Sequence, residues 1–183
     1  MKIRLASTLQ PDSIVDGEGI RTVIWTQGCP HHCPFCHNPQ THDFNAGELV
    51  DIDEIKKEIK ALKGQDGITL SGGDPMAQPL ECLELAKYAH ELGMNVWCYT
   101  GYLYEDVLKN KKMKSLLEEV DVLVDGKFKI EEFSLDLYYK GSRNQRVIDV
   151  KSSLEHGEVV LIEKYKGTKI FKNMYKKDEG MFI

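Results

Sequence analysis

The sequence lacks any apolar segment long enough to cross a membrane. Nowhere in its 183 residues do about 18 apolar residues stand together, and Met1–Gln10 has no sustained apolar stretch behind its early charges. It also lacks an excess of basic residues: 24 Lys and Arg face 29 Asp and Glu, a net charge of −5. No overall positive field attracts polyanions. We therefore expect a cytoplasmic protein that binds neither membranes nor nucleic acid.

Cysteine is scarce, with five residues in the chain, and three of them fall in one short segment. This distribution does not form a disulfide framework, and it indicates a reducing compartment. Cys82 lies in a helical pattern and Cys98 in a strand-like one. We predict that both are buried as small apolar residues, without a redox role.

The chain is also short for a closed eight-unit βα barrel, which needs about 250 residues. Its 183 residues are enough for one domain with a substantial core. Any βα barrel in this protein must therefore be incomplete.

The cysteine segment is the strongest chemical signal in the sequence. It reads Cys29-Pro30-His31-His32-Cys33-Pro34-Phe35-Cys36 and follows the apolar stretch 21–27. A CxxxCxxC triplet on a loop after a strand supplies three thiolates to one metal centre, and no nearby fourth cysteine completes the set. A centre that is one protein ligand short is typical of catalytic sites. A structural Cys3His zinc site that uses His31, His32 or His37 is the alternative from the residues alone.

Helical and strand periods alternate after the triplet. We expect helices over 53–63, with Asp53 as the N-cap, over 79–92 and over 104–119, and strands over 21–27, 67–71, 95–100 and 120–124. This order predicts an α/β protein with a mostly parallel sheet built from βαβ units. Segments 159–163 and 168–171 flank Lys166-Gly167 like the two arms of a hairpin.

In such a sheet, ligands collect at the carboxyl ends of the strands. Polar and glycine residues follow each predicted strand: Gln27-Gly28, Ser71-Gly72-Gly73-Asp74, Tyr99-Thr100-Gly101 and Asp125-Gly126-Lys127. The pair Gly72-Gly73 indicates a place where backbone approaches another group closely or adopts a positive φ.

The triplet, with Gly28 before it and His37-Asn38-Pro39 after it, resembles the radical S-adenosylmethionine superfamily. The resemblance implies that Cys29, Cys33 and Cys36 bind three irons of a [4Fe-4S] cluster, while S-adenosyl-L-methionine chelates the fourth. It implies reductive cleavage of that cofactor to methionine and a 5'-deoxyadenosyl radical. It also implies a single radical S-adenosylmethionine domain over 1–183 with the fold of a partial βα barrel.

Further motifs narrow the resemblance. They are Asp16-Gly17-Glu18-Gly19-Ile20-Arg21, Ser71-Gly72-Gly73-Asp74-Pro75, Trp97–Tyr102, Val124–Phe128 and Gly141-Ser142-Arg143-Asn144-Gln145-Arg146. In this order they resemble the glycyl-radical-enzyme activating family, and within it the activators of anaerobic ribonucleoside-triphosphate reductase, over about residues 12–150. The implied reaction removes a hydrogen atom from a glycine Cα of the reductase, with an electron donor such as flavodoxin or ferredoxin. Activation of another glycyl radical enzyme, such as pyruvate formate-lyase, is the nearest alternative, and a zinc-stabilised binding module without catalysis is another.

Carried over residue by residue, the resemblance also implies contacts with S-adenosylmethionine. Gly72 and Gly73 match the glycine-rich element at the methionine amino group. Phe35, Cys36 and His37 match the adenine contact beside the last cysteine. Asp125 and Lys127 match an Asp-x-Lys element near the ribose and carboxylate. The resemblance assigns no role to the C-terminal extension, residues 151–183.

Overall fold

Four parallel strands form the centre of the sheet in the computed structural model, which describes residues 1–168. They are β3 (Arg21–Thr26), β5 (Gly67–Gly72), β6 (Asn95–Tyr99) and β7 (Val122–Asp125), hydrogen-bonded in that order. Each was predicted as a strand within two residues of its observed ends, because a strand covered on both faces is apolar along most of its length.

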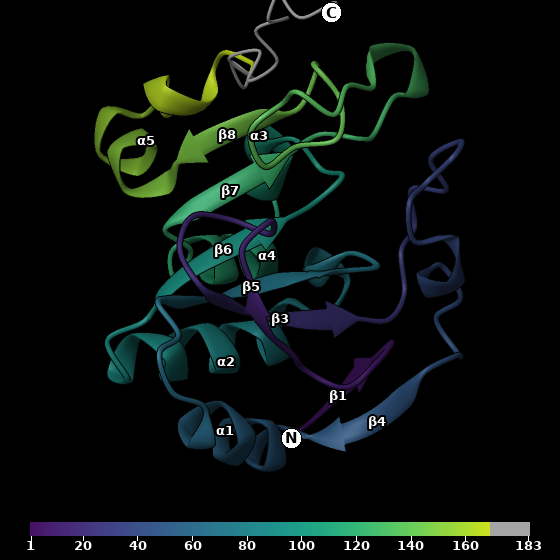
Figure 1. The fold of residues 1–183 in the computed structure, drawn as a ribbon, viewed down its shortest axis with the longest axis vertical. Coiled ribbons are helices and arrows are strands. Elements are labelled where there is room, and N and C mark those ends of the chain that lie inside the picture. The colour runs from purple at the N-terminus through teal and green to yellow at the C-terminus, as the bar shows by residue number, and fades with distance from the viewer. Residues whose placement is uncertain (169–183) are drawn as a thin grey trace, which may run out of the picture.

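Antiparallel strands flank this centre (Figure 1). The sheet order is β4 (Glu48–Asp51), β1 (Lys2–Leu5), β3, β5, β6, β7 and β8 (Arg146–Asp149), with β2 (Gln10–Ser13) paired to β3 beside this path. The edges of the path, β4 and β8, are therefore different strands, and the sheet is open. The α/β class and the largely parallel centre are confirmed, whereas the partial barrel stays an interpretation.

The helices pack on one face of the sheet. They are α1 (Ile52–Ala61), α2 (Pro79–Glu91), α3 (Tyr104–Val107), α4 (Lys111–Leu117) and α5 (Val150–His156). Alternate strand residues such as Ile24, Leu70 and Cys98 point into the main core, where they meet α1 and α2. Cys82 and Cys98 are both fully buried in this core, as predicted.

The other face of the sheet is covered by aromatic side chains from the later part of the chain. Trp97 of β6 packs edge-on against Tyr139 and Tyr165, with ring centroids 5.2 and 5.8 Å apart. Tyr165 belongs to a short 3-10 helix, Glu163–Tyr165. The described part of the C-terminal extension therefore helps to cover the sheet.

Two helix details differ from the predictions. Asp51, not Asp53, caps α1, because its carboxylate accepts the backbone N–H of Asp53. The predicted helix 104–119 is split into α3 and α4. Asn110 interrupts it, since its side chain accepts the N–H groups of Lys112 and Met113 as the N-cap of α4.

Only the first arm of the predicted hairpin, 159–163, and Thr168 of the second arm lie within the described residues. Leu161 bridges Ile148, and Thr168 bridges Leu137, so neither of these two residues pairs with the opposite arm. Residues 169–171 of the second arm lie outside the described residues. None of the helices in residues 1–168 combines the length and apolar composition that crossing a bilayer requires.

Candidate iron-sulfur site

The cysteine loop leaves the carboxyl end of β3, at the edge of the sheet where the parallel strands end (Figure 1). Backbone hydrogen bonds fix its base: Gly28 N donates to Thr41 O (2.8 Å), and Cys29 N donates to His42 O (3.2 Å). Gly28 O in turn accepts the N–H of Asp74 at 2.9 Å. These bonds hold the base of the loop, which follows β3, against the segment that follows β5.

The glycine pair is required by this close approach. A Cβ on Gly73 would lie 2.4 Å from the carbonyl oxygen of Gly28, which is backbone and has no room to move. Gly72 has a φ of +103°, and a Cβ there would lie 2.5 Å from the backbone of Thr26. The predicted close approach is therefore present, and its partner in this structure is the base of the cysteine loop.

The three thiols differ in exposure. Cys29 is buried, and burial raises the pKa of its thiol to about 11. Cys33 and Cys36 are partly exposed. Burial also raises the pKa of Cys33, although the N–H of Phe128 and the charge of Lys127 oppose this shift. Without a metal, Cys29 and Cys33 are therefore neutral thiols at neutral pH, and metal binding must release their protons.

The spacing of the ligand atoms separates the two kinds of metal site. With Zn–S bonds of about 2.3 Å, the sulfur ligands of a tetrahedral zinc lie about 3.8 Å apart. Within residues 1–168, one set of three metal-ligating side chains has its ligand atoms within 4.8 Å of one another: Cys29, His31 and Asp74. The three cysteines are not such a set. As placed, the three thiols therefore do not form a ready-made site for a single ion.

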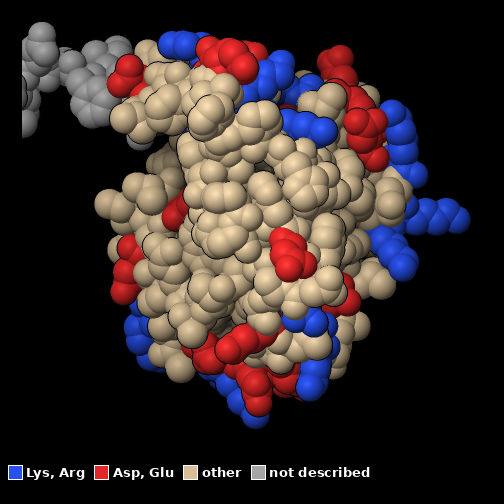
Figure 2. Space-filling model, turned by 90° about the vertical axis from the view of Figure 1, so that its right-hand side faces the viewer, with Lys and Arg blue, Asp and Glu red and all other residues tan. Residues whose placement is uncertain are grey.

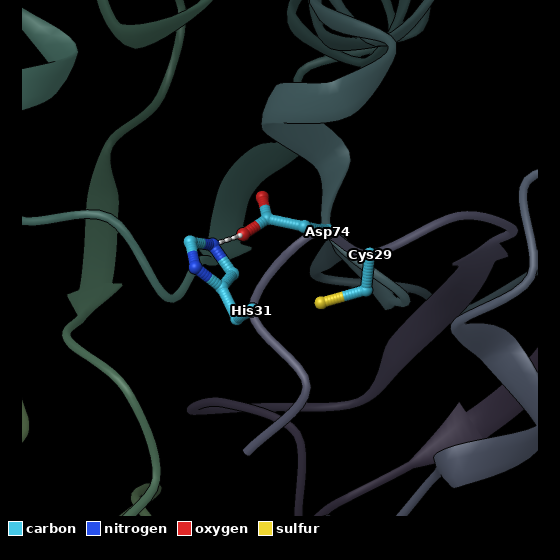
Figure 3. Close-up of side chains that lie close together, drawn as sticks. All are labelled: Cys29, His31 and Asp74. Carbon is cyan, nitrogen blue, oxygen red and sulfur yellow. Dashed lines mark hydrogen bonds and ion pairs between the residues drawn. The ribbon is translucent and has the colours of Figure 1, made fainter.

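Asp74 ties the loop to two strand ends. Its carboxylate is fully buried and accepts hydrogen bonds from Met76 N (2.9 Å), Thr100 Oγ1 (2.9 Å) and Gly101 N (3.0 Å). His31 Nε2 lies 2.7 Å from the second oxygen (Figure 3). The network joins the cysteine loop to the carboxyl ends of β5 and β6.

In the sequence, Asp74 stands out only as part of a glycine motif, and His31 only as one of three candidate zinc ligands. One feature of the sequence could have indicated a structural role for Asp74: it stands just before Pro75 at the end of a buried strand, where an aspartate commonly caps a turn. Nothing local indicated that His31 would be its partner, because the two lie 43 positions apart.

The residues matched to the adenine contact lie on the outer half of the loop. Phe35 is 76% exposed and has a φ of +58°, a conformation that is rare for residues other than glycine. His37 is exposed, and its ring packs 4.7 Å from that of Phe128. Lys127 is also exposed, and its charge acts on Cys33. These three residues therefore lie around the triplet.

Asp125 is placed differently. It is fully buried, and its carboxylate accepts two hydrogen bonds from the Arg146 guanidinium, one of them 2.9 Å from Nε. It also accepts the N–H of Tyr104 at 2.8 Å. Because its oxygens have partners within the chain, this placement weighs against a contact with ribose hydroxyl groups.

The motif Gly141–Arg146 supports the turn after β7. Gln145 Nε2 donates to Gly126 O (3.0 Å), and Asn144 Nδ2 donates to Lys127 O (2.8 Å). Gln145 Oε1 accepts the N–H of Gly141 at 2.8 Å. The motif thereby fixes the segment that carries Lys127 and Phe128 against the cysteine loop.

Comparison with known proteins identifies the relatives of this chain. A family model described as "4Fe-4S single cluster domain" matches residues 15–148. The structure also aligns with QueE from Escherichia coli at a TM-score of 0.49 and 13% identity, over 72% of this chain and 73% of that one. That structural likeness is too slight to support an inference.

Three curated relatives share the name anaerobic ribonucleoside-triphosphate reductase-activating protein. The protein from Haemophilus influenzae is 34% identical over 74% of this chain and 91% of its own. Those from Escherichia coli K12 and Enterobacteria phage T4 are each 32% identical, over 75% and 76% of this chain and 93% and 90% of their own. The chain therefore belongs to the family of anaerobic ribonucleoside-triphosphate reductase-activating proteins.

Proposed function

We propose that this chain is an oxidoreductase that activates an anaerobic ribonucleoside-triphosphate reductase by generating a glycyl radical on it. One observation carries the proposal: three thiols on one loop at the carboxyl end of a parallel sheet, one ligand short of a complete set, in a chain whose relatives carry the activator name. Those names favour the reductase over pyruvate formate-lyase as the target. The match to a family model described as a 4Fe-4S single cluster domain favours a cluster over the zinc-stabilised module.

Cys29, Cys33 and Cys36 would hold a [4Fe-4S] cluster and leave one iron for S-adenosyl-L-methionine. A reduced cluster held there would supply the electron for cleavage of this cofactor to methionine and a 5'-deoxyadenosyl radical, which would take a hydrogen atom from the reductase. Residues of this chain hold the cysteine loop in place on two sides. Asp74 and His31 hold the Cys29 side of the loop, while Phe128 contacts its Cys33 side.

The proposed cofactor contacts follow the same loop. We assign Phe35, Cys36 and His37 to the adenine and Gly72 and Gly73 to the methionine end. Lys127, exposed beside the triplet, supplies a cation for the methionine carboxylate. Asp125 matches the family's ribose element in position, but its carboxylate is already paired with Arg146.

The face around the cysteine loop suits a protein substrate. Figure 2 shows the side toward which β3 points: most of its centre is uncharged, and most charged residues lie toward its margins. Three large exposed apolar side chains lie on or beside the loop: Phe35 within it, Phe44 beside Gly28, and Phe133 beside His37. An exposed apolar surface of this kind is typical of protein interaction sites. The reductase would dock there, and a flavodoxin or ferredoxin in the cytoplasm would supply the electron.

The test is to load the protein with iron and sulfide without oxygen, reduce it, and mix it with S-adenosylmethionine and the reductase. We expect a glycyl radical in the electron paramagnetic resonance spectrum, and none when Cys36→Ala replaces the wild type. Pyruvate formate-lyase offered in place of the reductase should stay without a radical. A protein that forms no iron-sulfur cluster even after a chelator has removed any bound zinc would contradict the proposal.

A further inference from the structure

We propose that the cluster-free protein holds a single divalent transition-metal ion between Cys29, His31 and Asp74. These three side chains come from two segments, the cysteine loop and the end of β5, and point toward a common space (Figure 3). Their ligand atoms lie within 4.8 Å of one another. The set is distinct from the cysteine triplet, since it contains one thiol instead of three.

The donors suit a zinc-like ion. Sulfur, imidazole nitrogen and carboxylate oxygen together favour Zn²⁺, Fe²⁺ or Co²⁺ over the hard cations Mg²⁺ and Ca²⁺. Bonds of about 2.0–2.3 Å place tetrahedral ligands about 3.3–3.8 Å apart. The donors therefore need to move by about 1 Å, and three protein ligands leave the fourth position to water.

The site is largely pre-formed because its members are buried and held. The side chains of His31 and Asp74 are 7% and 1% exposed, and Cys29 is 7% exposed. An ion would replace the proton between His31 Nε2 and Asp74, which are 2.7 Å apart, and would bind the same oxygen. The hydrogen bonds of Asp74 with Met76, Thr100 and Gly101 remain and orient the carboxylate.

Occupation by a single ion and by a cluster exclude each other, because both use Cys29. This consequence rests on the proposed [4Fe-4S] cluster, whereas the single-ion site does not. A zinc ion bound here would block cluster assembly until it is removed.

Co²⁺ titration of the reduced, cluster-free protein tests the site, with thiolate-to-cobalt absorption as the signal. We expect His31→Leu and Asp74→Asn to weaken binding at least tenfold and Cys29→Ala to abolish the thiolate band. Cys33→Ala/Cys36→Ala should bind as wild type does, and so should His32→Leu, which changes an exposed residue of the same loop. Thermal unfolding shows whether each variant is folded. If Asp74→Asn does not fold, the cobalt affinity of His31→Leu decides the outcome.

Loss of cobalt binding in Cys33→Ala/Cys36→Ala, with normal binding in His31→Leu, would overturn the proposal in favour of the three thiols. A second measurement adds Zn²⁺ before iron and sulfide. Zinc should suppress cluster formation in the wild type and much less in His31→Leu; equal suppression in both proteins would also contradict the site. Normal cobalt binding in a protein that never takes up a cluster would refute the proposed function alone.

Discussion

At the scale of single residues, the geometry of the cysteine loop depends on a buried carboxylate that binds no metal in the proposed active form. Asp74 satisfies donors from Met76, Thr100 and Gly101 and receives His31 from the loop. Removing one acceptor that serves several buried donors leaves each of them unsatisfied, at about 1–3 kcal/mol for each group. Fold and site are therefore coupled through this side chain.

The cysteines are expected to fall into two classes. Changing Cys29, Cys33 or Cys36 singly to alanine should abolish the proposed cluster, because each thiolate would bind a different iron and no other cysteine belongs to the loop. Cys82→Ala and Cys98→Ala, matched changes in the core, should keep the cluster and lose about 1 kcal/mol of stability. Iron and sulfide analysis after reconstitution checks this. Full cluster content in any triplet variant would refute the assignment.

Gly73→Ala should displace the base of the cysteine loop. The added methyl carbon would meet the Gly28 carbonyl at 2.4 Å, and relieving such a clash costs about 1–3 kcal/mol. We expect lower stability in urea and less iron per chain. Gly167→Ala is the matched control, because nothing lies within 4 Å of its Cβ position. If the two variants retain equal amounts of iron, the close approach has no role in holding the loop.

The pairing of Asp125 with Arg146 predicts a mainly structural role for Asp125. Arg146→Met leaves a fully buried carboxylate unpaired, which costs about 3 kcal/mol. Urea unfolding should show this loss, and Arg146→Lys should recover only part of it because lysine lacks the planar fork. S-adenosylmethionine affinity, measured by calorimetry, should change little in Asp125→Asn. A large drop in affinity without a drop in stability would instead place Asp125 at the nucleoside.

At the scale of elements, the strands and helices with repeated apolar patterns were predictable from the sequence. The short strands and the polar residue that divides the third helix were not. The central strands were predictable because residues such as Ile68 and Leu70 are buried beside strand-forming neighbours. The antiparallel strands β1 and β4 have only four residues each, and alternation over so short a stretch is a weak signal. The division of the third helix depended on Asn110, whose preference for the N-cap outweighed the helical pattern around it.

The contact of α2 with the segment between α4 and β7 should make stability depend on pH. Burial alone would lower the pKa of His90, but hydrogen bonds with Asp121 and Glu119 outweigh it and raise the pKa. The stabilisation is therefore complete below the unfolded pKa of about 6.5 and is lost as pH rises through the folded value.

His90→Gln should accordingly lower the urea midpoint at pH 6 more than at pH 9. In a Glu119→Gln background the difference between the two pH values should shrink, since one acceptor is gone. An equal effect of His90→Gln at both pH values would mean that the His90 ion pairs do not contribute in solution.

At the scale of the whole molecule, the parallel strands bring separate loops to one edge. The loops after β3, β5, β6 and β7 all contribute to the surroundings of the triplet, through Cys29, Asp74, Thr100 and Phe128. The βα pattern predicted this convergence, since ligand sites lie at the carboxyl ends of parallel strands. The pairing of His31 with Asp74 was not predictable, because it depends on side-chain directions in a loop without a repeating pattern.

In the proposed reaction, the 5'-deoxyadenosyl radical would take a hydrogen atom directly from a glycine of the reductase, at the edge of the sheet that carries the cysteine loop. Holding the two reacting groups together without intervening water favours this transfer over side reactions. The most direct test places deuterium on the Cα of that glycine and follows it after anaerobic activation. We expect deuterium to appear in 5'-deoxyadenosine as the glycyl radical forms. A glycyl radical formed without transfer of the label to 5'-deoxyadenosine would contradict it.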